Sequence, residues 1–384
     1  MKYRYFSLII PVLAIVFAFQ VAGPNPAAAA PVKESRAAAA TKTTSQAEWD
    51  SLIKAAQKEG RVVIYGASMG DAAGHLKKAF SDRYGIEMEF QVGRGSGEIV
   101  QRLLTERRAG LYAADMGNGG LLTFFNVITP ANIALPLEPM IMLDEVKDPA
   151  KWRIGRIPLL GKKKQIVAPA SMTSHYIAVN GDMVKEGEIT SFDDLLDPKR
   201  KGKIVINNPT IPGRGNNWFS YMMLQLYGKE TGPEYMKKLL LNQPMVLRDE
   251  RLQVEWVAKK KYPVLVAGKQ TIVQSFITAG APLKWVKLKG AAMLSSGSFY
   301  LYAYQNAPHP NAQKVFLNWI LSKEAGEIIA KTGGFPSERI DVSRAGFDPT
   351  LLPGPNDVME DEDYTLQSLV MPGIAAKIFK DILQ

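Results

Sequence analysis

The sequence contains no cysteine. This absence excludes disulfide bonds, thiolate catalysis, zinc sites with Cys ligands and lipid attachment through an N-terminal Cys. Histidine is scarce too: His75, His175 and His309 are the only three, and they lack the close spacing of common metal motifs. A His-rich metal site is therefore not expected, and each histidine is interpreted as a surface or hydrogen-bonded side chain.

Several signatures of enzymes and nucleic-acid-binding proteins are also missing. The chain has no H-E-x-x-H, P-loop or kinase DFG pattern, which lowers the expectation of catalysis without excluding it. The net charge is +10, of which Lys2 and Arg4 contribute two, leaving +8 for a chain without residues 1–30. Acids and bases are interleaved and no long basic run alternates with aromatics, so we expect a solvated surface and no nucleic-acid partner.

Residues 1–30 have the three parts of a signal peptide. Lys2 and Arg4 precede the apolar stretch 6–21, and alanines occupy 27–30. This pattern predicts export to the periplasm and cleavage after Ala30. An uncleaved membrane anchor is the alternative, because the apolar stretch is near the minimum length for a span. Residues 31–45, rich in Ala, Thr, Lys and Ser, are predicted to form a flexible leader.

The rest of the chain predicts an α/β fold. At 384 residues it is too long for one typical core, so two lobes are expected. Helical spacing at 49–58 is followed by the β-branched strand 61–65, a helix to 84, a strand at 86–92 and another helix from 99. Alternation of this kind is typical of a parallel sheet.

Ligands of open α/β sheets lie beyond the carboxyl ends of the strands. In the first half of the chain this rule selects Ser68, Arg94, Ser96 and Asn118 as candidate ligand-binding residues. The loop Gly93-Arg94-Gly95-Ser96-Gly97 lacks the spacing of a dinucleotide fingerprint, so a nucleotide cofactor is not expected, nor any other cofactor. A tight turn without a ligand is the alternative interpretation of this loop.

The strongest local signal is the loop that ends with Gly213, Arg214, Gly215 and Asn216, just before a predicted helix. Backbone amides, a helix dipole and a guanidinium suit a carboxylate or phosphate. The alternative is that Asn216 merely caps the helix and Arg214 is solvated. Gln270, after the strand 264–267, is a further candidate.

Two other features are interpreted structurally. Tyr300, Tyr302 and Tyr304 alternate along a strand and are first expected on a sheet face, with ligand stacking as the alternative. The acidic run 360–363 is interpreted as a solvated surface in the C-terminal tail.

Several segments together resemble a known family. They include Glu59-Gly60-Arg61-Val62-Val63-Ile64-Tyr65-Gly66, Gly97-Glu98-Ile99-Val100-Gln101-Arg102, Ser191-Phe192-Asp193-Asp194-Leu195-Leu196-Asp197-Pro198 and Ala307-Pro308-His309-Pro310-Asn311-Ala312. The chain resembles the periplasmic solute-binding proteins of ABC importers, extracellular family 1, in the iron(III)-binding-protein-like branch.

The resemblance implies a type II periplasmic-binding-protein fold, with a ligand cleft between two hinged α/β lobes. The lobes are expected at 46–137 plus 295–345 and at 138–294 plus 346–384. Iron-binding members have a tyrosine pair after the strand matched by 264–267, where this chain has Gly268-Lys269-Gln270-Thr271. The loop with Arg214 lies where relatives hold an anion.

The expected function is capture of a small anionic solute by hinge closure and its delivery to an ABC permease, by a monomer that is not an enzyme. A protein that binds ferric iron or a metal–anion complex is the alternative within the same fold. An exported hydrolase or lyase is the alternative from another class.

Overall fold

The computed structural model describes residues 45–93, 96–211, 214–286, 288, 292–354 and 357–383. The predicted signal peptide and most of the predicted leader lie outside the described residues. Residues Thr43–Gln384 form one compact unit. No helix within the described ranges has the length and apolarity needed to cross a membrane.

The first of two large sheets has six strands in the order β2-β1-β3-β13-β5-β4. β1 pairs in parallel with β2 and β3, whereas β13, from much later in the chain, is antiparallel between β3 and β5. The bounds are β1 Arg61–Gly66, β2 Glu87–Val92, β3 Met116–Asn118, β4 Leu159–Leu160, β5 Ile166–Val167 and β13 Leu301–Ala303.

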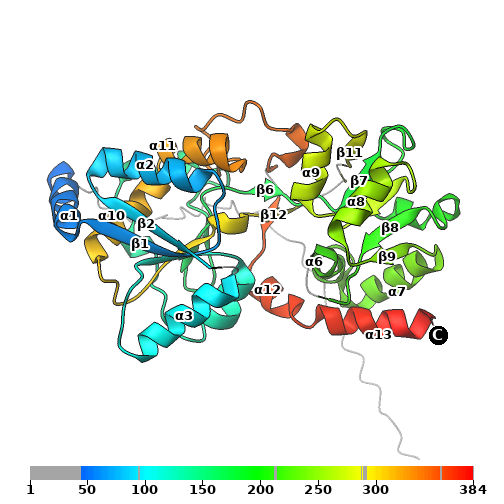
Figure 1. The fold of residues 1–384 in the computed structure, drawn as a ribbon, viewed down its shortest axis with the longest axis horizontal. Coiled ribbons are helices and arrows are strands. Elements are labelled where there is room, and N and C mark those ends of the chain that lie inside the picture. The colour runs from blue at the N-terminus through cyan, green and yellow to red at the C-terminus, as the bar shows by residue number, and fades with distance from the viewer. Residues whose placement is uncertain are drawn as a thin grey trace, which may run out of the picture. The chain divides into compact units, whose positions relative to one another are not determined.

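Both faces of this sheet are buried, as the β-branched run in β1 predicts. Side chains alternate along a strand, so Val62 and Ile64 pack into one core with Phe80 of α2, while Val63 and Tyr65 pack into another with α3. Figure 1 shows α2 (Ala72–Tyr84) and α3 (Ser96–Arg108) on opposite sides of β1 and β2. The predicted β-α-β-α unit is confirmed.

The second large sheet has five strands in the order β11-β7-β10-β8-β9. β8 is parallel to β9 and β10, and β7 is antiparallel to β10 and β11. The bounds are β7 Ile177–Asn180, β8 Ile204–Asn207, β9 Met245–Leu247, β10 Val264–Val266 and β11 Leu283–Trp285. The predicted two-lobed α/β fold is confirmed by these two sheets, each with its own cores.

The remaining helices cover the sheets and connect their strands. The bounds are α1 Gln46–Glu59, α4 Leu121–Thr123, α5 Asp144–Lys147, α6 Arg214–Tyr221, α7 Gly228–Leu241, α8 Glu250–Ala258, α9 Gln270–Thr278, α10 Pro310–Ile320, α11 Lys323–Ile328, α12 Glu362–Ser368 and α13 Met371–Leu383. Two π-helical turns, η1 (Phe124–Ile128) and η6 (Met222–Leu226), extend α4 and α6. α1 begins with a capping box made by Ser45 and Glu48.

A third, small sheet forms where the chain passes between the large ones. β6 (Met172–Thr173) lies between β5 and β7 in the chain, β12 (Met293–Ser295) lies between β11 and β13, and β14 (Val358–Met359) pairs with β12. The chain therefore crosses three times. β4 and β5 fall in the range predicted for the second lobe but pair in the first sheet, because a short strand pattern does not reveal its partner.

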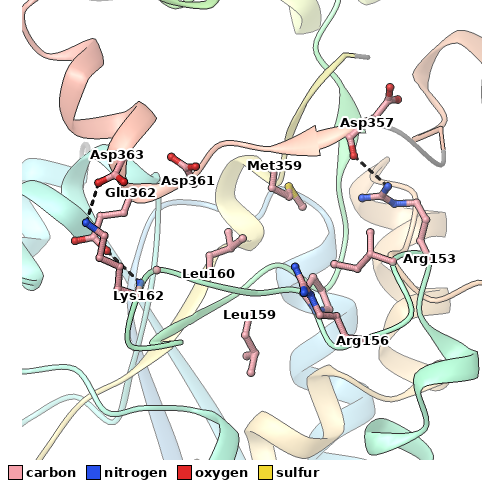
Figure 2. A pocket seen from close by; sticks show the side chains of 13 residues that line it. Arg153, Arg156, Leu159, Leu160, Lys162, Asp357, Met359, Asp361, Glu362 and Asp363 are labelled. Carbon is pink, nitrogen blue, oxygen red and sulfur yellow. Dashed lines mark hydrogen bonds and ion pairs between the residues drawn. The ribbon is translucent and has the colours of Figure 1, made fainter. Parts of the chain in front are cut away.

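The C-terminal tail is tied to the segment around β4 by charged side chains (Figure 2). The buried side chains of Arg153 and Glu338 form an ion pair, with 2.9 Å between Arg153 Nε and a Glu338 carboxylate oxygen. Arg153 Nη1 also donates to the carbonyl oxygens of Gly354 and Asp357. Lys162 Nζ lies 2.9 Å from an Asp363 carboxylate oxygen. Arg153, Asp357, Lys162 and Asp363 line a cavity of about 530 Å³, and because their contacts join the tail to the segment around β4 we interpret this region as an anchor for the tail.

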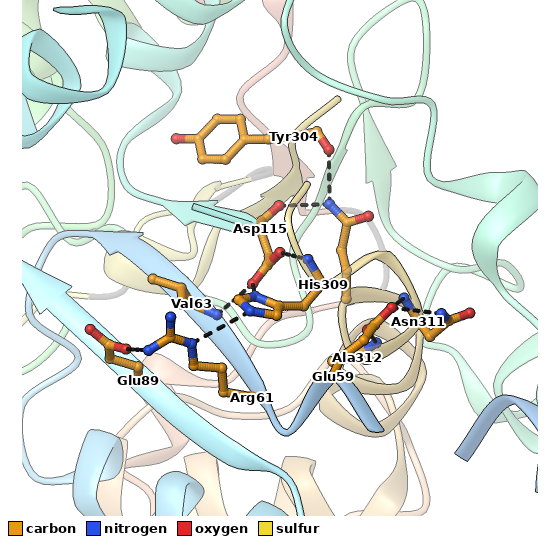
Figure 3. Close-up of polar contacts among 10 residues, drawn as sticks. Glu59, Arg61, Val63, Glu89, Asp115, Tyr304, His309, Asn311 and Ala312 are labelled. Carbon is orange, nitrogen blue, oxygen red and sulfur yellow. Dashed lines mark hydrogen bonds and ion pairs between the residues drawn. The ribbon is translucent and has the colours of Figure 1, made fainter. Parts of the chain in front are cut away.

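A buried aspartate holds the first lobe together (Figure 3). Asp115 Oδ2 accepts from the backbone N–H of Val63 at 2.7 Å and lies 2.9 Å from His309 Nδ1, while Oδ1 accepts from the His309 N–H at 2.8 Å. Burial raises the pKa of the Asp115 carboxyl, and these hydrogen bonds oppose the rise. The carboxylate thus connects β1, β3 and the start of α10, which are far apart in sequence.

Replacing this carboxylate should destabilise the protein. In Asp115→Asn the amide NH₂ would face either the Val63 N–H or the His309 N–H, leaving a buried donor unpaired. We expect a loss of about 2–4 kcal/mol in the free energy of unfolding, measured by chemical denaturation. The matched control is Asp82→Asn, since Asp82 is exposed and pairs only with Lys78, and it should change stability by less than about 0.5 kcal/mol. Equal effects of the two variants would contradict this role.

Candidate functional site

The predicted anion loop leads directly into α6, which begins at Arg214. The side chain of Asn207, at the end of β8, accepts from the backbone N–H of Gly215 at 2.8 Å. A Cβ on Gly215 would lie 2.2 Å from the carbonyl oxygen of Asn207, so only glycine fits there. This contact fixes the first turn of α6 against the carboxyl end of β8, and it occupies the Gly215 amide that was predicted to bind a ligand.

Arg214 is held in place by neighbours that carry no charge. Its guanidinium lies over the ring of Tyr176, 4.4 Å from the centroid, and Nη2 donates to the carbonyl oxygen of His175. Burial raises the pKa of Tyr176, so this phenol is neutral at physiological pH. Arg214 forms no ion pair with any described residue, and its buried Nε has no hydrogen-bond partner among them. The alternative interpretation, a solvated Arg214, does not describe this side chain.

A cavity of about 390 Å³ lies beside the N-terminal half of α6. Its walls come from the start of α4, from α6, from the segment that follows β12, and from the C-terminal tail and α12. The lining residues are Gly120, Leu121, Leu122, Asn216, Asn217, Ser220, Ser295, Gly297, Tyr300, Glu360, Tyr364, Thr365, Ser368, Leu369 and Pro372. This cavity therefore brings together elements from both large sheets and from the tail.

Asn216 is the predicted site residue that lines this cavity. It is 8% exposed, and its Oδ1 has no hydrogen-bond partner among the described residues. Arg214 does not line the cavity. Its positive charge acts on Glu360, which does line it. Arg94 and Gly213 lie outside the described residues, and Ser96 is the first residue of α3.

Glu360 is a site residue that the sequence interpretation missed. Burial raises the pKa of its carboxyl to about 7, and the positive charge of Arg214 opposes this rise. Prediction of a solvated run at 360–363 is therefore wrong for Glu360, because β14 carries it into the molecule before the chain turns into α12. Asp361 caps α12 by accepting from the Tyr364 N–H, and Asp363 is the exposed partner of Lys162. The sequence does contain one signal of this position, because Glu360 directly follows the apolar pair Val358-Met359, which is typical of a strand.

The remaining candidates have structural partners. Asn118 is buried and donates from Nδ2 to the Ala67 carbonyl at 2.9 Å; a Cβ on Gly66 would lie 1.7 Å from Asn118 Oδ1, so glycine makes room for this side chain. Gln270, at the start of α9, donates to the Thr173 carbonyl at 3.3 Å and contacts Met172 Sδ. Asn118 and Gln270 do not line the 390 Å³ cavity.

Ser68 lies in the loop between β1 and α2. Residues 66–70 read Gly-Ala-Ser-Met-Gly, which has the G-x-S-x-G spelling of a hydrolase nucleophile turn. Ser68 is exposed, and its Oγ accepts from the Gly70 N–H at 3.1 Å. No histidine among the described residues hydrogen-bonds to it, so the loop lacks the base that such a nucleophile needs.

The three tyrosines of the 300–304 segment have different surroundings. Tyr302 and Tyr304 pack in the core of the first sheet, as predicted. Tyr300 lines the 390 Å³ cavity, and its buried hydroxyl interacts with the Ser295 side chain and the Ser296 backbone. Within the same described ranges, no group of three or more His, Asp or Glu side chains is placed to hold a metal ion.

Comparison with known proteins identifies the family and the fold of the chain. The family described as "Bacterial extracellular solute-binding protein" matches residues 75–345. An uncharacterized protein of Haemophilus influenzae is 25% identical over 319 residues, covering 77% of this chain and 84% of that protein.

Solved structures share the fold at low sequence identity. The Trichodesmium protein IdiA (FutA), in complex with iron and citrate ligands, has a TM-score of 0.64 and 17% identity, covering 84% of this chain and 99% of that one. Mannheimia haemolytica ferric iron-binding protein A in an open conformation has a TM-score of 0.63 and 13% identity, and the match covers 84% of this chain and 98% of that one. Actinobacillus pleuropneumoniae AfuA, with exogenous fructose-6-phosphate bound, has a TM-score of 0.56 and 21% identity, with 84% and 99% covered.

The family match spans well over half of the chain, and the solved structures share its two-lobed periplasmic-binding fold. The chain belongs to the bacterial extracellular solute-binding proteins, the solute-capturing components of ABC importers.

Proposed function

We propose that the chain is exported, captures a small anionic solute by closure of its lobes, and delivers it to a membrane permease without catalysing a reaction. The observation that carries this proposal is the state of Arg214. Arg153, Arg200 and Arg339, whose side chains are buried, each pair with a carboxylate, whereas the partly buried Arg107 is like Arg214 in contacting aromatic rings and one carbonyl oxygen. Arg214 has an aromatic ring and one carbonyl oxygen, so most of its guanidinium donors remain for a ligand.

The chemistry of Arg214 favours an anion. A guanidinium has a planar set of donors that matches the two oxygens of a carboxylate or the oxygens of a phosphate. The N-terminus of α6 adds a favourable dipole at the same place. A ligand anion would also compensate a charge that burial otherwise makes costly.

Hinge closure is supported by the three short strands that connect the lobes. Segments as short as β6, β12 and β14 can act as hinges when a ligand has higher affinity for the closed state. We propose that the carboxyl ends of β1 and β3, with Ser68 and the loop that includes Arg94 and Ser96, close over a ligand held by the second lobe.

Other parts of the proposal rest on the sequence. Residues 1–30 would direct the protein to the periplasm and be removed after Ala30, and the mature chain would act as a monomer. The second candidate cargo is ferric iron or a metal–anion complex, which is favoured by structural neighbours whose names record iron.

Arg214 should be essential for binding the cargo. Thermal melting of residues 31–384 against small acids, phosphate esters, sugars, polyamines and ferric salts should show a raised Tm with one class of anion. Arg214→Ala should weaken that binding by about 10- to 100-fold, because a charge-assisted contact is lost, and Arg214→Lys should recover only part of it.

Arg251→Ala is the matched control, since Arg251 is exposed in the same lobe, where it pairs with Glu255 and lies over the Phe276 ring; its ligand response should equal that of the wild type. A Tm shift with ferric salt alone would replace the anion by iron as cargo. Turnover of a bound compound would assign the chain to the enzymes.

Glu360 should make anion binding depend on pH. Its raised pKa of about 7 means that the carboxyl is neutral below pH 7 and becomes an anion above it, where it competes with a ligand for Arg214. Affinity for a fully ionised carboxylate ligand should therefore fall by roughly tenfold between pH 6 and pH 8. In Glu360→Gln the affinity should be nearly constant over this range, as measured by titration calorimetry. A wild-type affinity that does not change with pH would show that Glu360 does not face the ligand.

A further inference from the structure

Two side chains that line the 390 Å³ cavity have a buried polar atom with no hydrogen-bond partner among the described residues. They are Asn216 Oδ1 and Ser220 Oγ, on residues that are 8% and 0% exposed, and the Tyr300 hydroxyl, which interacts with Ser295 and Ser296, belongs to a third lining residue. Buried polar atoms in folded proteins are nearly always hydrogen-bonded, because an unmet one costs about 1–3 kcal/mol. Two such atoms on residues that line one cavity indicate that a bound molecule supplies the missing hydrogen bonds.

These groups differ in kind from the Arg214 site. An amide oxygen can only accept, whereas the hydroxyls of Ser220 and Tyr300 can both donate and accept. Glu360 adds a carboxyl group to the same wall, and Tyr364 adds another phenol. A set that mixes acceptors with two-way hydroxyls matches the hydroxyl groups of a ligand, each of which also donates and accepts.

An ammonium group suits this cavity less well. It can only donate, so it would leave the hydrogen atom of the Ser220 hydroxyl without an acceptor. It would also need an ionised Glu360, in competition with the nearby charge of Arg214. Apolar ligands would leave the polar atoms of Asn216 and Ser220 unpaired.

Part of this wall comes from the C-terminal tail. Glu360 and Tyr364 lie beyond residues 75–345, the part matched by the family. α12 contacts α4 and η1 on one side and α6 on the other. The tail thus supplies part of the cavity wall, including Glu360, on which the charge of Arg214 acts.

We propose that this cavity holds the hydroxyl-bearing part of the ligand whose anionic group is bound by Arg214, so that the cargo is a small polyhydroxylated anion. The inference rests on the proposed function, because it places the anionic group at Arg214. The cavity volume of about 390 Å³ is in the range of small-molecule sites. Carboxylate and phosphate share the required charge, and the experiment separates them.

The test is titration calorimetry on residues 31–384 with matched ligands. One pair is propionate and gluconate, the other is inorganic phosphate and glucose 6-phosphate, and phosphoethanolamine carries an ammonium group in place of hydroxyls. We expect the hydroxylated member of at least one pair to bind at least tenfold more tightly than its plain partner, and phosphoethanolamine to gain nothing over phosphate. The pair with the larger gain identifies the anionic group.

Two variants remove single atoms from the cavity wall. Tyr300→Phe and Ser220→Ala should each weaken binding of the hydroxylated ligand by about 5- to 30-fold, since one hydrogen bond is lost. Binding of the plain anion should change by less than about twofold. Tyr302→Phe is the matched control, because Tyr302 lies outside the cavity and its hydroxyl interacts with Tyr304. Melting temperatures of the ligand-free variants show that each one folds.

The outcomes separate the two proposals. If hydroxylated and plain anions bind equally, or if Tyr300→Phe and Ser220→Ala leave selectivity unchanged, the cavity holds only water and this inference is wrong, while loss of binding in Arg214→Ala still supports anion capture. A preference for phosphoethanolamine would replace hydroxyl recognition by ammonium recognition. If no anion binds, or Arg214→Ala binds as the wild type does, both proposals are overturned.

Discussion

The buried carboxylate of Asp115 is the contact on which the first lobe depends. It joins β1, β3 and the start of α10, so one side chain connects residues that are 52 and 194 positions apart. A lobe built from segments so distant requires the chain to leave it, form the second lobe and return. The crossing strands, and therefore the hinge, are a consequence of this discontinuous construction. Asp115 also fixes the position of β3, whose end lies next to the start of α4 at the edge of the 390 Å³ cavity.

In the second lobe, the partly buried charge of Arg214 is not matched by hydrogen bonds in the way that the charge of Asp115 is. Asp115 has its hydrogen bonds supplied by the protein, whereas Arg214 has an aromatic face and a single carbonyl oxygen. A partly buried charge without a counter-ion carries a desolvation cost that an anionic ligand would offset. The neutral phenol of Tyr176 orients the guanidinium without neutralising it. Glu360, whose carboxyl has a pKa of about 7, compensates it only in part near neutral pH.

Sequence reasoning located the elements better than their partners. The β-branched run of β1, the glycine-rich turns and the loop before α6 follow from local patterns, and so did the choice of Arg214. Asn118 and Gly215 were also chosen as ligand residues, but their hydrogen-bonding groups are used by Ala67 and Asn207, partners that no local pattern reveals. Glu360 was missed for the converse reason: its acidic neighbours indicate a solvated surface, and only the pairing of β14 with β12, far away in sequence, makes it a cavity residue.

The C-terminal tail links the hinge to the cavity. β14 is one of the three crossing strands, Glu360 follows it directly, and α12 packs against elements of both lobes. Upstream of Glu360, Asp357 is held by Arg153; downstream, Asp363 is held by Lys162, so the tail is anchored on both sides of the cavity residue. Under the proposed hinge closure, movement of the lobes would change the position of Glu360 relative to Arg214. A ligand in the cavity would then stabilise one such position, and this would couple its chemistry to closure.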